Sequence, residues 1–210
     1  MIKLQGSLPK NIIVACSGGV DSMAALDFLR RRHCVIAAYF EHHPDQVSKG
    51  AWKVVKDYCE QHHIARETGS IAGKKTKRRS QEEFWRTERY KWLHFLGELY
   101  AMPVVTAHHL DDCVETWIWS SMHGEGKVIP YRYKSVVRPF RLNKKANMQM
   151  WAELNNVPWL DDPSNTDTRY VRNHIRHELM PHAQKVNPGL HKMVKKKLLR
   201  EKVKETVNEY

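Results

Sequence analysis

A short run of glycines and serines could bind phosphate groups. The apolar segment Asn11–Cys16 is followed by S-G-G-V-D-S at residues 17–22. Two adjacent glycines allow a sharp turn that brings backbone N–H groups close to an anion, and a following helix would add its positive N-terminal end. Ser17 and Ser22 add hydroxyl donors. The run therefore predicts a site for a phosphate chain, with an incidental Gly-Gly turn as the alternative.

Two adjacent carboxylates stand in a second such segment, H-H-L-D-D-C-V-E-T at residues 108–116. Asp111 and Asp112 are hard oxygen ligands of the kind Mg²⁺ takes, and such an ion neutralises charge on reacting phosphates. His108 could position or protonate a reacting group. Asp is also favoured at helix N-termini as a capping residue, so this segment alone leaves both explanations open.

A third segment pairs a turn with two arginines. D-D-P-S-N at residues 161–165 predicts the turn, and R-N-H-I-R follows at residues 172–176. Arg172 and Arg176 lie one helical turn apart and could bind phosphates together. Pro181 is expected to end their helix. The alternative is a surface helix whose arginines pair within the helix or face solvent.

These three segments together resemble the tRNA(Ile)-lysidine synthetases, members of the PP-loop ATP pyrophosphatases. S-G-G-x-D-S resembles the PP-loop, and residues 108–116 resemble H-H-x-D-D-Q-x-E-T, with Cys113 in place of the usual Gln. R-x-x-R-Y at residues 86–90 and R-P at 138–139 extend a likeness that covers most of residues 11–190. The resemblance implies a ligase: the C2 oxygen of a wobble cytidine attacks the α-phosphate of ATP, and lysine then displaces AMP.

The resemblance also implies the cofactors ATP and Mg²⁺ and the substrates tRNA(Ile) and L-lysine. The residues it assigns to ATP are Ser17, Gly18, Gly19, Val20, Asp21, Ser22, Arg86 and Arg89. Those it assigns to catalysis are Asp21, Asp111, Asp112, His108 and Arg172, the three aspartates also holding the metal. Those it assigns to substrate are Glu115, Asn165, Asn173 and Arg176, with Glu115 expected to receive a proton from the lysine amine.

Besides Cys113, the sequence departs from the family in two further places. Glu41-His42-His43 stands where the family commonly has Asn-His-Gly. The family generally carries further C-terminal domains that help to hold tRNA, so this chain looks like a short form. Its basic runs at residues 74–79, 144–145 and 192–204 would take over that work, with a solvated surface as the alternative.

Charge is the informative feature of the composition. The 210 residues hold 35 Lys+Arg and 23 Asp+Glu, a net charge of +12, which favours a polyanionic partner such as nucleic acid. No apolar run approaches the roughly 20 residues that cross a bilayer, and no secretory signal stands at the N-terminus. The four cysteines are scattered without a closely spaced pair. We expect a cytoplasmic protein without membrane association; its oligomeric state is open.

Short apolar runs alternate along the chain with stretches of helical periodicity. Together they predict the strands and helices that position these segments. The expected strands are Asn11–Cys16, Val35–Phe40, Ile64–Thr68 and Pro103–Ala107. The expected helices are Asp21–Arg32, Gln46–His62, Gln81–Tyr100, Asp111–Met122, Asn143–Asn155, Thr168–Met180 and Leu190–Val207. This order indicates an α/β fold, a Rossmann-like parallel sheet with helices on both faces and a small helical extension. We expect an ATP-binding domain at residues 1–140 and a basic helical extension at 141–210.

Three other functions remain open at this stage. A tRNA thiolase would use the same adenylation and is distinguished by sulfur in its product. A small-molecule ATP pyrophosphatase, such as an amide-forming synthetase, would release pyrophosphate without RNA. A non-catalytic tRNA-binding remnant would bind RNA without consuming ATP.

Overall fold

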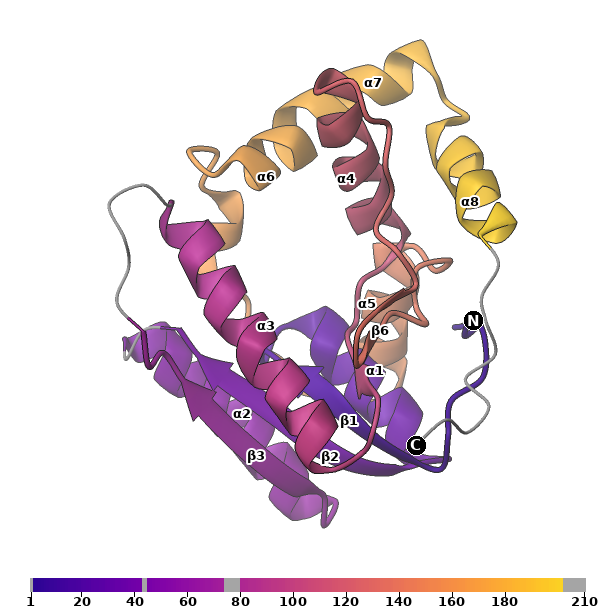
Figure 1. Cartoon of the computed structure of the whole chain (residues 1–210). Helices are drawn as coiled ribbons and strands as arrows, with labels where there is room; N and C mark the ends of the chain where they lie inside the picture. The colour runs from indigo at the N-terminus through magenta and orange to yellow at the C-terminus, as the bar shows by residue number, and fades with distance from the viewer. Residues whose placement is uncertain (1, 43–44, 74–79, 202–210) are drawn as a thin grey trace.

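The strands form one six-stranded sheet in the order β3-β2-β1-β4-β6-β5, and the labelled strands β1, β2 and β3 lie in the lower part of Figure 1. The computed structural model describes residues 2–42, 45–73 and 80–201. The strands are β1 Asn11–Cys16, β2 Cys34–Glu41, β3 Ala65–Ser70, β4 Val104–Val105, β5 Arg132–Tyr133 and β6 Val136–Val137. Every pairing is parallel except that of β5 with β6, which is an antiparallel hairpin at the sheet's edge.

Helices cover both faces of this sheet. Those of the first part are α1 Val20–Arg30, α2 Gln46–Gln61, α3 Gln81–Leu99 and α4 Leu110–Met122. Alternate residues of β1 show the two faces: Ile12 and Val14 pack in the core with α1 and α2, whereas Ile13 packs with α3. This alternation follows from the two-residue period of a strand. Figure 1 shows α3 alone in front of the sheet, with α1 and α2 behind it.

The later part of the chain is helical. Its elements are α5 Lys145–Leu154, the 3-10 turn η1 Pro163–Thr166, α6 Val171–His174, the π-helix η2 Ile175–Leu179, α7 Met180–Val186 and α8 Leu190–Arg200. Met148 and Ala152 of α5 complete the core beneath α1, while α8 and η2 build a separate apolar cluster with α4. The division at residue 140 stays a prediction.

The predicted fold class is confirmed, and three details differ. The expected strand Pro103–Ala107 is only Val104–Val105, and the β5–β6 hairpin was not predicted. The prediction that Pro181 ends its helix is wrong. The π-helix η2 precedes Pro181, and Pro181 lies in the first turn of α7. A proline is tolerated there because first-turn N–H groups have no partner within their own helix.

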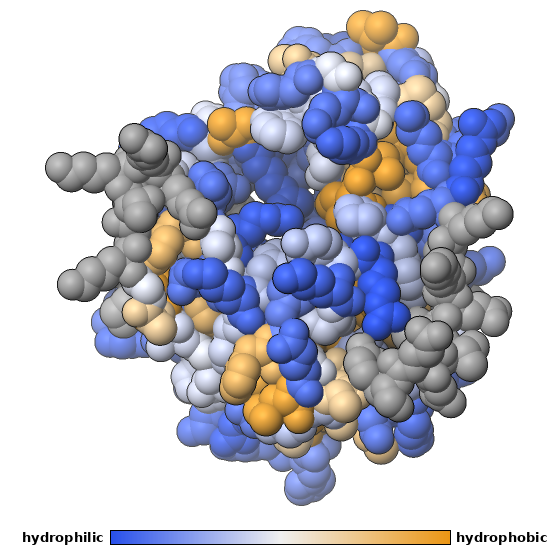
Figure 2. Space-filling view, viewed as in Figure 1, coloured by the Kyte–Doolittle hydropathy of each residue, from blue (hydrophilic) through white to orange (hydrophobic). Residues whose placement is uncertain are grey.

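Two further observations concern the surface and the chain's end. Among the described residues no helix is long and apolar enough to span a bilayer. Hydrophilic residues cover most of the face seen in Figure 2, and hydrophobic residues form small separate patches on it. The expected helix Leu190–Val207 is observed over Leu190–Arg200, and Glu201 after it is not helical; residues 202–207 and the basic run at 74–79 lie outside the described residues.

Candidate active site

The topology brings the first two sequence motifs to one edge of the sheet. The chain leaves β1 toward β2 on one side, whereas β4 pairs with β1 on the other side. Such a switch point in a parallel sheet opens a crevice at the carboxyl ends of its strands. Residues 17–22 follow β1 and residues 108–112 follow β4. Both motifs therefore reach the same crevice.

The glycine-rich loop has the sharp turn that its sequence predicts. Gly18 has a φ of 82°, and a Cβ atom there would lie 2.8 Å from the carbonyl oxygen of Ala51. Only glycine meets both conditions. The hydroxyl of Ser22 accepts from the N–H of Ser17 (3.1 Å) and donates to the carbonyl of Gly19 (2.9 Å). Ser22 thus shapes the loop from within, and the loop leads directly into the N-terminus of α1.

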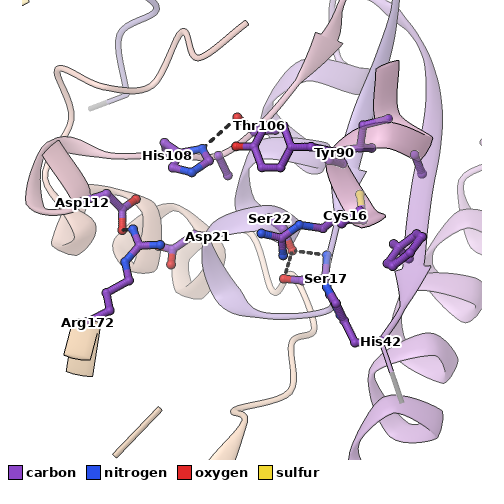
Figure 3. A pocket seen from close by; sticks show the side chains of 16 residues that line it. Cys16, Ser17, Asp21, Ser22, His42, Tyr90, Thr106, His108, Asp112 and Arg172 are labelled. Atoms are coloured by element: carbon purple, nitrogen blue, oxygen red, sulfur yellow. Dashed lines mark hydrogen bonds and ion pairs between the residues drawn. The ribbon is translucent and has the colours of Figure 1, made fainter. Parts of the chain in front are cut away.

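A cavity of about 220 Å³ lies above this loop (Figure 3). Its lining includes side chains from both motifs and from the third segment: Ser17, Asp21, Ser22, His108, Asp112 and Arg172. Arg89 and Tyr90 of α3 and His42 after β2 complete its polar wall. Segments from five parts of the sequence therefore converge on one cavity.

Asp21, Asp111 and Asp112 surround a histidine. Nε2 of His109 lies 3.6 Å from Oδ2 of Asp21, and Nδ1 lies 3.6 Å from Asp111 and 3.5 Å from Asp112. Burial alone would lower the pKa of His109, but the charges of Asp112 and Asp21 raise it above its usual value. The imidazole joins the two motifs at the centre of the acid group.

Both adjacent aspartates cap helices. The carboxylate of Asp112 accepts from the backbone N–H of His109 in a capping box at the start of α4. Asp111 accepts from the N–H of Lys145, at the start of α5, and lies 3.1 Å from Nε2 of His191. Burial opposes ionisation of Asp111, yet the hydrogen bonds from His191 and Lys145 lower its pKa to about 2. The capping explanation is confirmed for Asp112.

The two arginines of the third segment, which are partly exposed, form an ion-pair network with buried carboxylates of α4. Arg172 donates to Glu115 (3.0 Å) and Asp112 (2.8 Å), and Arg176 donates to Glu115 (2.6 Å). The Glu115 side chain is only 2% exposed. Burial opposes ionisation of Asp112, but the charges of His109 and Arg172 hold its pKa well below its usual value. Both arginines do lie on one face of their helix, as predicted, and that face meets α4.

The three aspartates fit a magnesium ion only in part. Oδ1 of Asp21 is buried and has no hydrogen-bond partner, as expected of an oxygen that awaits a cation. The oxygens of Asp111 and Asp112 are already engaged by protein groups. No group of three His, Cys, Asp or Glu side chains in the described part of the chain forms a metal site. Asp21 is therefore the carboxylate best placed to share a magnesium ion with phosphate oxygens.

Neutral and cationic groups also form part of the cavity wall. Burial lowers the pKa of His108 well below its usual value, and Nδ1 of its ring lies 2.8 Å from Oγ1 of Thr106. Burial and the nearby charge of Arg89 lower the pKa of His42 to about 4. Within the described ranges, the guanidinium of Arg89 has no paired carboxylate. This wall offers a positive charge and neutral imidazoles to an anionic ligand.

Several predicted residues lie outside the cavity. Val20 packs against the core at the start of α1, and Arg86 faces a separate hollow beside α3. The Asn173 side chain donates to the carbonyl of Asp167, which fixes the turn before α6. The Cys113 side chain is buried in the cluster of α4 and α8, so it does not take the place of the missing amide at the site. The Asn165 side chain is outside the described residues.

Sequence reasoning missed three partners. The sequence indicates histidines beside the paired acids, but not that the ring of His109 lies among all three aspartates. Thr106, which holds His108, belongs to an apolar run with no distinguishing signal. His191 stands 80 positions from Asp111, so no local pattern could pair them.

Comparison with known proteins shows the family. A model described as the PP-loop domain matches residues 3–183. The chain belongs to the PP-loop domain family. The matched range includes the loop at residues 17–22 and every segment that lines the cavity above it.

Similar PP-loop proteins include tRNA(Ile)-lysidine synthases. That of Thermotoga maritima is 30% identical over 219 residues, which cover 96% of this chain and 53% of the relative. That of Francisella tularensis subsp. holarctica (strain OSU18) is 30% identical and covers 87% and 48% respectively. The chain thus spans about half the length of the curated relatives it matches.

Solved structures support the fold. The U34-tRNA thiolase NcsA from Methanococcus maripaludis, solved with its [4Fe-4S] cluster, matches with a TM-score of 0.75 at 15% identity, covering 97% of this chain and 76% of that one. The NH3-dependent NAD synthetase from Campylobacter jejuni matches with a TM-score of 0.55 at 15% identity, covering 96% and 91%. At these identities the likeness concerns the fold alone.

Proposed function

We propose that this PP-loop protein joins L-lysine to C2 of the wobble cytidine of a tRNA(Ile), using ATP and releasing AMP and pyrophosphate. One observation carries the proposal. Residues of the glycine-rich loop and of the paired-acid segment line one cavity, and Nε2 of the buried His109 lies 3.6 Å from Oδ2 of Asp21 in its wall. The named relatives, tRNA(Ile)-lysidine synthases, make lysine and tRNA the expected substrates.

The residues of the cavity suit adenylation. The backbone N–H of Gly18 and those at the N-terminus of α1 would donate to phosphate oxygens, whereas the N–H of Ser17 already donates to Ser22. Arg89 and Arg172 would offset the charge that builds on the α-phosphate and on the departing pyrophosphate. A magnesium ion held by Asp21 and the phosphates would supply further neutralisation. The neutral ring of His108 would orient the nucleotide or the cytidine without adding charge.

The second step needs a neutral lysine amine. Glu115 remains the proposed proton acceptor, but both of its oxygens accept from guanidinium groups. Arg172 and Arg176 would therefore have to release Glu115 before it takes a proton. Since Arg172 also lines the cavity, its attraction to bound phosphates would favour that release.

Transfer of labelled lysine tests the proposal. Purified protein is incubated with ATP, radiolabelled lysine and total bacterial tRNA, and the digested nucleosides are examined. We expect label in one nucleoside, dependent on ATP and tRNA. Asp21→Asn should lower the rate at least a hundredfold because the free carboxylate oxygen loses its charge.

Asp57→Asn on the outer face of α2 is the matched control and should keep full activity. Absence of lysine label with active tRNA would overturn the lysine step. Incorporation of sulfur instead would assign the protein to thiolation. Full activity in Asp21→Asn would remove the role given to that carboxylate.

A further inference from the structure

A second hollow lies between α3 and the β5–β6 hairpin and has a volume of about 750 Å³. It is separate from the PP-loop, but Tyr90 lines both this hollow and the candidate active site. The hairpin is held against α3 at Gly97, where a Cβ atom would lie 2.5 Å from the Cβ of Ser135. We call this hollow the hairpin groove.

Three aromatic rings form a row along the hairpin groove. The ring centroids of Tyr90 and His94, one turn apart on α3, are separated by 6.1 Å. Those of His94 and Tyr133 on β5 are separated by 5.6 Å, at an angle of 60°. Tyr133 is 52% exposed although it is a large hydrophobic side chain. An exposed ring at the end of an aromatic row is a surface on which a planar group can stack.

Cations stand beside the same rings. The guanidinium carbon of Arg86 lies 4.9 Å from the centroid of Tyr90, and Nζ of Lys134 lies 5.9 Å from that of Tyr133. The lining holds four Lys and Arg side chains against two Glu. Cations interleaved with aromatic rings are typical of surfaces that bind single-stranded nucleic acid, since each nucleotide brings one phosphate and one base.

Two buried polar atoms of the lining lack partners. Nε2 of His94 and Nε of Arg138 are buried without a hydrogen bond. The other ring nitrogen of His94 lies 2.8 Å from Oγ of Ser135, which fixes the ring's orientation. Unsatisfied buried polar groups are rare in proteins and call for an explanation. Both atoms lie beneath the surface of the hairpin groove, so a base stacked on Tyr133 would lie over them without bonding to either.

We propose that the hairpin groove binds unpaired nucleotides of RNA. A base stacks on Tyr133 next to His94, and the adjoining phosphates lie by Lys134 and Arg86. Because Tyr90 borders both hollows, a strand lying in the groove runs up to the edge of the active site. This proposal rests on the proposed function only in taking the RNA to be the tRNA that is modified; the binding itself needs no catalysis.

Binding of RNA without ATP tests the groove. The dissociation constants of a short RNA hairpin with an unpaired loop and of a fully paired RNA duplex of equal length are measured by fluorescence anisotropy. Tyr133→Ala should weaken hairpin binding about tenfold and leave duplex binding unchanged, because only unpaired bases stack. Lys134→Gln should weaken hairpin binding and lower the slope of log K against log salt by about one.

Two matched variants control for general effects. Trp119→Ala removes an aromatic side chain that is 45% exposed on α4, and Lys53→Gln removes an exposed lysine on α2. Neither residue lines the hairpin groove. Both variants should bind the hairpin like the unmodified protein, and circular dichroism should show that all four variants are folded.

Three results would overturn the groove proposal: unchanged hairpin binding in Tyr133→Ala, equal losses for hairpin and duplex, or displacement of the hairpin by polyglutamate as effectively as by polyuridine. Its failure is distinguishable from failure of the proposed function. Lysine transfer with no Tyr133 effect on binding would reject the groove alone. A Tyr133 effect on binding without lysine transfer would reject the lysine reaction alone.

Discussion

The Asp112 side chain has both of the roles that the sequence alone left as alternatives, namely capping a helix and contributing to the site. Its carboxylate caps α4 through the N–H of His109, and it also pairs with Arg172 in the cavity wall. The residue type and its place after β4 could be predicted, because Asp is favoured at helix starts and ligands gather at that sheet edge. The pairing of Asp112 with Arg172 could not be predicted, because Arg172 belongs to a helix 60 residues later.

A second buried carboxylate, Asp27, allows a test at the residue scale. It accepts from the hydroxyl of Tyr58 (2.6 Å) and the indole of Trp151 (2.9 Å), and its Oδ1 pairs with Arg30 (2.7 Å). Burial would raise its pKa, but these hydrogen bonds and the Arg30 charge lower it from 3.8. We expect Asp27→Asn to lower the free energy of unfolding at pH 7 by about 2 kcal/mol, measured in urea.

The pH dependence follows from the direction of this shift. A carboxyl with a lowered folded pKa contributes stability above its unfolded pKa and loses that contribution as pH falls through the folded pKa. The difference between Asp27→Asn and the unmodified protein should therefore be constant near neutrality and shrink below about pH 4. Asp57→Asn, in an exposed pair, should stay close to the unmodified protein. A difference that grew on acidification would contradict this account.

At the scale of elements, long periodic segments were predictable and short ones were not. The buried run Asn11–Cys16 forms β1 with the predicted bounds, because a central parallel strand is apolar on both faces. β5 and β6 have two residues each, too few to show an alternation. The π-turn at Ile175–Leu179 also has no local signal. This segment, η2, packs against α4, and such a tertiary contact cannot be seen in the local sequence.

The contact between α4 and the helix of Arg172 and Arg176 gives a prediction at this scale. Glu115 bonds to both guanidinium groups and is almost wholly buried. Glu115→Gln keeps the shape but removes the charge, which leaves two cations facing Asp112 alone. Because breaking a buried ion pair is costly, we expect a loss of about 3 kcal/mol in the free energy of unfolding, measured in urea.

Asp167→Asn is the control for this prediction, because Asp167 pairs with the largely exposed Arg169 just before the same helix. It should leave stability nearly unchanged. If Glu115→Gln proved as stable as the control, the ion-pair network would not be what joins these helices.

At the scale of the whole molecule, the sheet topology explains why distant motifs form one site. Residues 17–22 and 108–112 meet because β1 and β4 are neighbours at the switch point. The sequence order of strands and helices was enough to predict a parallel sheet with both motifs at its carboxyl edge. The same sequence order could not predict that α8 packs where His191 lies beside Asp111. The net charge of +12 suits the proposed RNA substrate.

The central claim is that this crevice holds ATP so that its α-phosphate is attacked by an RNA base. The most direct measurement follows the products of α-labelled ATP, with and without tRNA, by thin-layer chromatography. We predict labelled AMP only when tRNA and lysine are both present, with an equal amount of labelled pyrophosphate in a parallel reaction that uses γ-labelled ATP. Labelled ADP, or AMP formed equally well without RNA, would contradict the account.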